Sequence, residues 1–485
     1  MPATTEPFLD QLNSNSEGNL KPKVGALITL ISIFFFWGFV AASNDILIPV
    51  FKKALNLSQF QSQLISFAFY VAYTVGSILY FVISSLLKKD ILNAIGYRNG
   101  LALGLVISAI GTLLFIPASN NASFVLLISG LFIVGLGFSL QQIAANPLAI
   151  QMGDPSKGNI RLSLAGGINN VGTTIGPVIV SFAIFGGLSS GETALNLEAV
   201  KTPYLILGAA FLLAAVVFKL SNVPDHIGDQ KEKKEVSIIQ TLQYPQVMLG
   251  MLAIFLYVGV EVATASNLPE FMKQKLGTPE NAVAPYVSLF WASLMIGRWT
   301  SAAGVFNLSE QLKSLMGILL PFVAFGIFLL VNFIAGSDIQ SFYPYLGIVI
   351  ILIIADKLSK GNPASQLLIY SFLGIIALII GIFSSGMISV FAFISVGLFC
   401  STLWPCIFTL AITGLGEKTN TASSLLIMMI MGGGFISTAQ GALASDQFLG
   451  IQHSYWVGVL CFMYLAFFAY RMKDLQKIES SKDDL

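Results

Sequence analysis

The chain has 485 residues, of which 55% are hydrophobic and 10% are charged, and its formal net charge is +1. Soluble domains carry about 25% charged residues, so this composition, with a mean hydropathy of +0.81, excludes an ordinary soluble domain and indicates a membrane protein. The small net charge offers no basic surface to nucleic acid. The three cysteines, Cys400, Cys406 and Cys461, lie inside apolar runs without CxxC spacing, so neither a disulfide framework nor a zinc site is expected.

The first segment, 1–24, is polar and carries three acidic residues, Glu6, Asp10 and Glu17. It lacks the basic stretch and short apolar core of a cleaved signal peptide. We therefore expect a cytoplasmic N-terminal tail, followed by a first span that itself directs membrane insertion.

Apolar runs follow one another along the rest of the chain. A spanning helix needs about 20 mostly apolar residues, and on this basis we expect about 14 transmembrane helices. The run at 343–356 is the shortest, and a re-entrant helix is its alternative. The runs are 25–51, 62–87, 101–118, 124–152, 161–188, 203–222, 247–271, 286–306, 314–335, 343–356, 366–386, 388–413, 421–443 and 455–470.

Most Lys and Arg residues fall on one side of the membrane in this arrangement. Of the 25 such residues, all but five are placed on the side of the two termini. An excess of this kind marks the cytoplasmic side, so both termini are expected there, in a bacterial inner membrane. The five exceptions are Lys52, Lys53, Lys201, Lys273 and Lys275.

The longest internal polar stretch, 223–246, predicts a cytoplasmic linker between two helical bundles. The bundles are expected at 25–222 and 247–470, and a cytoplasmic tail at 471–485. We expect an all-α membrane protein in which two six-helix bundles are supplemented by an inserted helical hairpin at about 314–356.

A weak internal repeat is the basis for the inserted hairpin. Pro49 and Pro269 end the first spans of the two halves and lie 220 positions apart, whereas Pro147 and Pro405 lie 258 apart. The second half has therefore gained about 38 residues between Pro269 and Pro405, which is the length of a helical pair. An inserted pair leaves the topology on either side unchanged.

Two carboxylates, Asp45 and Glu261, lie within the first span of each half. A charged residue at the centre of a spanning helix costs about 3 kcal/mol, so these residues are candidates for proton or cation coupling in an alternating cavity. The alternative is a static carboxylate held by donors such as Asn44 or Asn169.

Buried amides and aromatic residues provide a second set of candidates. Amides donate and accept hydrogen bonds at once, which suits polyhydroxylated ligands, and aromatic rings supply apolar faces for them. The alternative is that the amides join helices through interhelical hydrogen bonds worth about 1 kcal/mol each. The candidate sugar-binding residues are Trp37, Asn44, Gln141, Gln142, Asn146, Asn169, Asn170, Tyr257, Asn267, Trp291 and Trp404.

Four further residues are gating or structural candidates. Arg98 and Arg298 are expected at corresponding cytoplasmic ends of the two halves, where they stabilise one conformation or simply anchor the inside. Pro147 and Pro405 interrupt helical hydrogen bonding and are candidate hinges. An intramembrane enzyme is not expected, because both histidines fall outside the predicted spans and no nucleophile and base converge.

Six segments carry a family resemblance: WGFVAASNDILIP, QQIAANP, GNIRLSLAGGINN, FLYVGVEV, MIGR and MMIMGGG. At these segments the chain resembles the fucose/galactose/hexose symporter family of the major facilitator superfamily, over nearly its whole length except about 307–360 and the tails. The resemblance implies a twelve-helix core, alternating access and proton-coupled sugar uptake. It places Asp45 on the proton-linked aspartate of the family and Asn169 on a polar cavity position.

The chain also departs from the fucose carriers of that family. These carriers look to have a glutamate at the position of Gln142 and an asparagine at that of Ala42. Gln142 cannot titrate, and together with Glu261 it is similar to the glucose/galactose branch.

The expected function is therefore import of a hexose-type sugar by cation symport, with Asp45 as the main proton site and Glu261 as a second carboxylate that binds sugar hydroxyls or the coupling ion. No metal or cofactor is expected beyond H⁺, or Na⁺ as its alternative. The expected partners are a small-molecule sugar and the lipid bilayer, with the protein as a monomer. Alternative functions are a fucose or amino-sugar symporter, an uncoupled facilitator and a sugar sensor that does not transport.

Overall fold

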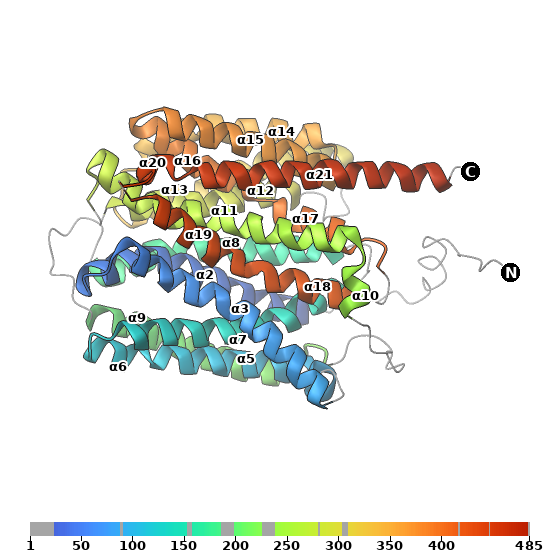
Figure 1. Cartoon of the computed structure of the whole chain (residues 1–485), viewed down its shortest axis with the longest axis horizontal. Coiled ribbons are helices and arrows are strands. Elements are labelled where there is room, and N and C mark those ends of the chain that lie inside the picture. Colours follow the sequence, from blue (N-terminus) through green and yellow to red (C-terminus); the bar gives the residue numbers. More distant parts are fainter. Residues whose placement is uncertain are drawn as a thin grey trace.

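The computed structural model describes nine parts of the chain, and the helices within them lie side by side (Figure 1). Lipid offers no hydrogen bonds to the backbone, so each apolar run satisfies its own peptide groups by forming a helix. The described residues are 24–87, 91–152, 158–185, 198–225, 238–279, 282–302, 309–415, 418–445 and 447–483.

Helices of the first half lie at one edge of the bundle, with α5, α6, α7 and α9 outermost (Figure 1). Two of the predicted spans differ here: the run 101–118 is divided between α5 and α6, and α9 begins five residues before the predicted span 203–222. The helices are α2 (Val24–Ala54), α3 (Gln59–Leu87), α4 (Ile91–Ile95), α5 (Tyr97–Leu113), α6 (Phe115–Asn120), α7 (Phe124–Gln151), α8 (Gly158–Phe185) and α9 (Glu198–Leu220).

Helices of the second half continue to the opposite edge, where α14 and α15 lie (Figure 1). They are α10 (Ile238–Leu242), α11 (Pro245–Leu276), α12 (Ala284–Ala302), α13 (Glu310–Ile334), the 3₁₀ helix η4 (Gln340–Tyr345), α14 (Leu346–Ser359), α15 (Pro363–Phe383), α16 (Gly386–Cys400), α17 (Leu403–Ile412), α18 (Thr419–Met428), the 3₁₀ helix η6 (Met429–Met431), α19 (Gly432–Leu443), α20 (Gly450–His453) and α21 (Trp456–Asp483).

The two halves repeat one pattern of helix pairing. In the first half, α2 packs on α8, α3 on α7, and α5 on both α7 and α9. In the second half, α11 packs on α19, α12 on α16, and α15 on both α16 and α21. Helices α13 and α14 fall outside this pattern. The halves meet mainly where α3 packs on α19 and α8 packs on α12.

Among the described residues, twelve helices are long and apolar enough to cross a membrane, which makes the chain a multi-pass membrane protein. The sequence predicted about 14, and the two runs outside the twelve are 161–188 and 286–306. Their helices, α8 and α12, have 28 and 19 residues, but the described parts are more polar. Helix α8 carries paired asparagines and threonines, and α12 carries Arg298.

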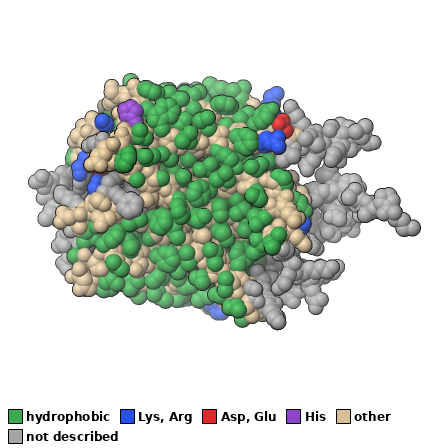
Figure 2. All heavy atoms as spheres, viewed as in Figure 1, with side chains coloured by type: hydrophobic (Ala, Val, Ile, Leu, Met, Phe, Trp, Pro, Cys, Tyr) green, Lys and Arg blue, Asp and Glu red, His purple; other side chains and the backbone are tan. Residues whose placement is uncertain are grey.

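The weakest predicted span, 343–356, is longer in the structure, because η4 and α14 together form an apolar run over 340–359. The visible face of the molecule is hydrophobic across its middle, and the coloured charged side chains lie at the two ends (Figure 2). This apolar band matches the surface that a bilayer requires.

The predicted linker and C-terminal tail are described in part. Residues 223–225 and the short helix α10 lie within the predicted linker 223–246, whose residues 226–237 lie outside the description. The predicted tail at 471–485 is helical as far as Asp483, because α21 continues beyond the bundle (Figure 1).

One helix that carries candidate residues is broken near its centre. Helices α16 and α17 are separated at Ser401 and Thr402, three residues before Pro405. Proline has no amide hydrogen for the helix ladder, so the break exposes backbone carbonyls beside the interface of the two halves.

Candidate functional site

A cavity of about 170 Å³ lies between the two halves. A single water needs about 10–15 Å³ by this measure, so the cavity has room for roughly a dozen water-sized groups. Helices α2, α3, α7 and α8 form one wall, and α11, α12 and α17 with η6 form the other. The lining residues are Phe34, Trp37, Gly38, Ala41, Phe69, Tyr70, Tyr73, Gln142, Asn146, Leu162, Gly166, Asn169, Thr173, Tyr257, Val258, Glu261, Val262, Trp291, Arg298, Trp404, Pro405 and Ile430.

The cavity brings together most of the residues that the sequence singled out. They come from six different helices, so only the tertiary fold makes them neighbours. The predicted residues on its walls are Trp37, Gln142, Asn146, Asn169, Tyr257, Glu261, Trp291, Arg298, Trp404 and Pro405.

Glu261 is the carboxylate on the described wall of this cavity. The hydroxyl of Tyr257, one helical turn earlier on α11, donates a hydrogen bond to its Oε2, as the i, i+4 spacing allows. The Trp404 ring lies 6.2 Å from the Tyr257 ring. A carboxylate beside two aromatic faces can accept hydrogen bonds from ligand hydroxyls while the rings cover apolar carbon.

Arg298 reaches across the interface between the halves. Its Nε donates to the Ser401 carbonyl at 2.9 Å, at the break between α16 and α17. Its Nη1 donates to the Gly166 carbonyl at 3.0 Å and to Asn170 Oδ1 at 3.3 Å, both on α8. The positive charge of Arg298 also interacts electrostatically with the Glu261 carboxyl group. Among the described residues, the cavity walls therefore carry one acidic and one basic side chain, both from the second half.

Gln141 and Gln142 are adjacent but have different roles. Gln142 faces the cavity, and its Nε2 donates to the Tyr73 hydroxyl at 3.3 Å. Gln141 is fully buried behind the wall, where its Oε1 accepts from Trp37 Nε1 at 2.8 Å and its Nε2 donates to Ser108 Oγ at 3.1 Å. Gln141 therefore orients the cavity tryptophan and is not itself on the wall.

The paired asparagines of α8 divide in the same way. Asn169 lines the cavity and donates from Nδ2 to the Phe34 carbonyl at 3.0 Å, which ties α8 to α2. Asn170 is buried, and its Oδ1 accepts from Arg298, while its Nδ2 has no partner among the described residues. Asn170 therefore contributes to the site indirectly, by accepting a hydrogen bond from Arg298.

Asn267 lies away from the cavity walls. It is fully buried on α11, donates from Nδ2 to the Ala263 carbonyl at 2.8 Å, and has no partner for Oδ1 within the described chain. The side chains of Asn44, Asp45 and Pro147 lie outside the description, although their backbones belong to α2 and α7. The coupling role of Asp45 stays a prediction.

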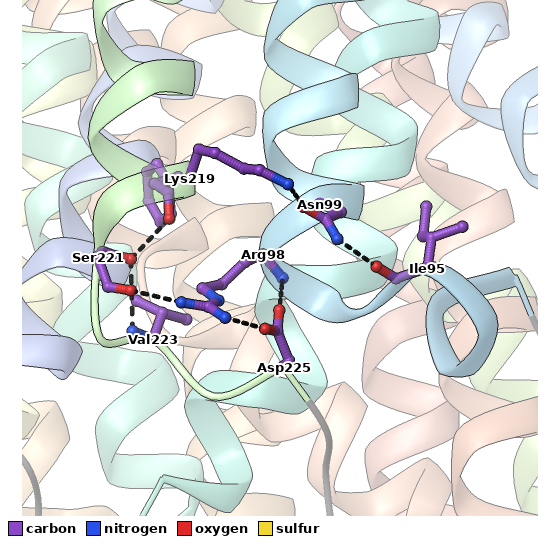
Figure 3. A network of polar contacts seen from close by, with 8 residues as sticks. Ile95, Arg98, Asn99, Lys219, Ser221, Val223 and Asp225 are labelled. Atoms are coloured by element: carbon purple, nitrogen blue, oxygen red, sulfur yellow. Dashed lines mark hydrogen bonds and ion pairs between the residues drawn. The ribbon is translucent and has the colours of Figure 1, made fainter.

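Arg98 holds together two helix ends within the first half (Figure 3). Its guanidinium pairs with Asp225 and donates to the Ser221 carbonyl at 2.8 Å, and its backbone N–H donates to Asp225 Oδ1 at 3.3 Å. These contacts join the start of α5 to the segment after α9. Arg98 and Arg298, expected at corresponding positions, therefore differ, because only Arg298 lines the cavity and reaches the other half.

Two polar residues of the cavity, Tyr70 and Tyr73 on α3, were not predicted from the sequence. The signal for the tyrosines was their hydroxyls in the middle of the apolar run FAFYVAYTVG, where a hydroxyl needs a partner.

Comparisons with known proteins agree with this architecture. The family model of the Major Facilitator Superfamily matches residues 26–354. The chain is 32% identical over 448 residues to a glucose/galactose transporter of Brucella abortus biovar 1 (strain 9-941), with 91% of this chain and 93% of the relative covered. It is 28% identical over 462 residues to the L-fucose-proton symporter of Escherichia coli (strain K12), with 91% of each covered.

Its structure is similar to the crystal structure of the Major Facilitator Superfamily transporter FucP in the outward conformation. The TM-score is 0.65 at 26% identity, and the match covers 92% of this chain and 98% of the other.

Proposed function

This chain belongs to the Major Facilitator Superfamily, a family of transporters and not of enzymes, and we propose that it imports a hexose-type sugar together with a proton by alternating access. The observation that carries the proposal is the composition of the cavity between the halves: amides, aromatic rings and one carboxylate line a space large enough for roughly a dozen non-hydrogen atoms. The related glucose/galactose transporter and fucose-proton symporter support a sugar as the substrate.

Glucose or galactose is favoured over fucose in this proposal. Gln142 is neutral, and its Nε2 is engaged with Tyr73, so the first-half wall offers neutral groups to the ligand. The second-half wall offers the Glu261 carboxylate, a strong acceptor for sugar hydroxyls. Fucose and amino sugars are the alternative substrates, and Na⁺ is the alternative coupling ion.

We propose Asp45 as the main proton site on the strength of its position within the first span and its place in NDILIP. Glu261 is the second carboxylate, which binds sugar hydroxyls or the coupling ion. Asp45→Asn should abolish uphill uptake but leave exchange of sugar across the membrane. Uphill uptake by this variant would show that the proton role of Asp45 is wrong.

The function is tested with labelled glucose, galactose and fucose in membrane vesicles under pH and Na⁺ gradients that are imposed independently. Uptake of glucose or galactose driven by the pH gradient alone supports the proposal. Uptake that neither gradient changes would indicate an uncoupled facilitator. Absence of counterflow in proteoliposomes, despite measurable sugar binding, would indicate a sensor.

We also propose that the chain crosses a bacterial inner membrane fourteen times, with both termini cytoplasmic and with α13 and α14 as an inserted pair. The repeated helix pairing supports this arrangement, because α13 and α14 are the long helices of the described second half without a counterpart in the described first half. It places the turn at Asp338 outside and the turn at Gly361 inside. Single cysteines at these two positions, probed with an impermeant maleimide in intact cells, should label at 338 only.

A further inference from the structure

Two charged contacts join the halves at opposite ends of the cavity. Lys52 Nζ lies 3.1 Å from Glu270 Oε2, between the last turns of α2 and the outer part of α11. Arg298 donates to Gly166 and Asn170 on α8. Helices α2 and α8 run in the same direction, since a Cβ at Gly172 would meet Phe35 and Phe39, and one at Gly176 would meet Phe39 and Ser43.

This alignment places Gly166 before the cavity residue Trp37 along the bundle axis, and Lys52 well beyond it. Fifteen residues separate Trp37 from Lys52, which corresponds to about 22 Å of helix. In the proposed topology, the Arg298 contact closes the cytoplasmic side of the cavity and the Lys52–Glu270 pair closes the outer side.

The contact between Arg298 and α8 depends on a glycine. A Cβ at Gly166 would lie 2.9 Å from Arg298 Nη1, closer than real Cβ contacts, so any side chain there must displace the guanidinium. The obstructing atom is the far end of a flexible side chain, and the helices need not move. The absence of a side chain at Gly166 therefore allows Arg298 to occupy this position, and a substitution there should shift the guanidinium without changing the packing of the helices.

Among the described residues, two of the three acceptors of Arg298, Gly166 and Asn170, belong to the other half, whereas Ser401 belongs to its own. When the cytoplasmic side opens, α8 and its acceptors move away from α12. A guanidinium in a poorly solvated place then requires a new partner. Glu261, in the same cavity and on the same half, can supply it.

We propose that Arg298 is a positioning residue that exchanges partners during transport, bound to Gly166 and Asn170 when the cytoplasmic side is closed and to Glu261 when it is open. The exchange of partners itself is independent of the proposed function. Only the link between this exchange and ion coupling rests on the proposed function. A protonated Glu261 releases its proton to water in the open inner cavity, and the carboxylate formed pairs with the guanidinium. Among the described residues, Tyr257 on α11 and Cys400 at the end of α16 interact electrostatically with Glu261, and Tyr70 and Tyr73 line the same cavity.

The proposal makes opposite predictions for two substitutions. Gly166→Ala keeps the backbone carbonyl but displaces the guanidinium from its partners on α8, so it should shift the protein towards the inward-open state. Glu261→Gln removes the partner of the open inner side and should shift it the other way. Both shifts should vanish in an Arg298→Gln background, because each acts through the guanidinium.

The shifts can be measured without any sugar. Cysteines replace Lys52 and Glu270 in all variants, and the yield with a short bis-maleimide reports closure of the outer side, while the native cysteines are buried. We expect the yield to rise at least threefold in Gly166→Ala and to fall at least threefold in Glu261→Gln. The matched control is Gly326→Ala on α13, where a Cβ would meet nothing within 4 Å, and it should match the parent.

Shifts in the same direction for both substitutions, or shifts that persist in the Arg298→Gln background, would overturn the proposal. Arg298→Lys keeps the charge but cannot reach Ser401 and α8 together, so it should restore part of the response. Sugar transport by the same proteins is assayed separately, and its absence would count against the proposed function without affecting the cross-linking result.

Discussion

The ion pair between Lys52 and Glu270 should hold the outer side of the cavity closed. At 3.1 Å the attraction between two unit charges is about 5 kcal/mol for an effective dielectric constant of 20. The side chains remain 28% and 19% exposed, so desolvation and screening reduce the net contribution to about 1 kcal/mol. That free energy corresponds to a shift of about fivefold between outer-closed and outer-open populations.

Lys52→Glu places two carboxylates opposite each other, and Glu270→Lys places two ammonium groups there. Each should raise the outer-open population fivefold or more, and the exchanged pair carrying both substitutions should return it close to wild type. The assay is the labelling rate of a cysteine at the cavity residue Ala41 by an impermeant maleimide in right-side-out vesicles. The control is Lys357→Glu on α14. It changes the net charge by the same amount but lies far from the cavity.

Single substitutions that leave the labelling rate within twofold of wild type would show that the ion pair does not hold the outer side closed. A double variant that labels as fast as the two single variants would show the same. Either result would mean that other contacts close the outer side and that the ion pair follows the closure passively.

Three further predictions concern the cavity walls and the residues that support them. Gln141→Leu leaves the Trp37 N–H without its 2.8 Å acceptor, so the free energy of unfolding should fall by about 1–3 kcal/mol, measured as a lower Tm in detergent; an unchanged Tm would contradict this. Glu261→Gln preserves shape but cannot carry charge, so proton-driven accumulation should fall at least tenfold while counterflow persists, and equal loss of both would point to a binding defect. Gly38→Ala places a Cβ 1.9 Å from the Asn169 carbonyl oxygen, a backbone atom, so the yield of monodisperse protein should collapse, and normal yield would show that α2 and α8 can separate.

The helices and their division into halves could be predicted from the sequence because each rests on a property of a whole segment. Apolar runs of about 20 residues must form helices in lipid. The extra residues between Pro269 and Pro405 predicted a helical hairpin, and α13 and α14 lie within that stretch; their origin as an inserted pair stays a prediction. The number of spans was less secure, because α8 and α12 carry the polar residues of the cavity and so lose the apolar signal by which spans are recognised.

The direction of individual side chains could not be predicted in the same way. Adjacent residues on a helix point about 100° apart. Helix α7 is apolar on nearly all sides, so its sequence has no polar face that would show which of Gln141 and Gln142 points towards the cavity. Only the packing of α7 against α3 and α5 decides which amide faces the cavity. Asn169 and Asn170 on α8 posed the same problem. The contact of Arg298 with α8 depends on the missing side chain at Gly166, which becomes apparent only once α8 and α12 are packed together.

Gln142 and Glu261 belong to different halves but face one cavity, so the neutral amide on α7 and the carboxylate on α11 are within reach of the same ligand. The surroundings differ, however. Gln142 contacts the neutral Tyr73 hydroxyl, whereas Glu261 shares the second half with Arg298. A carboxylate on α11 moves together with its guanidinium partner, while that partner's contacts to α8 break and form with each closure. Such an acid is coupled to the motion of the halves in a way that an acid on α7 would not be.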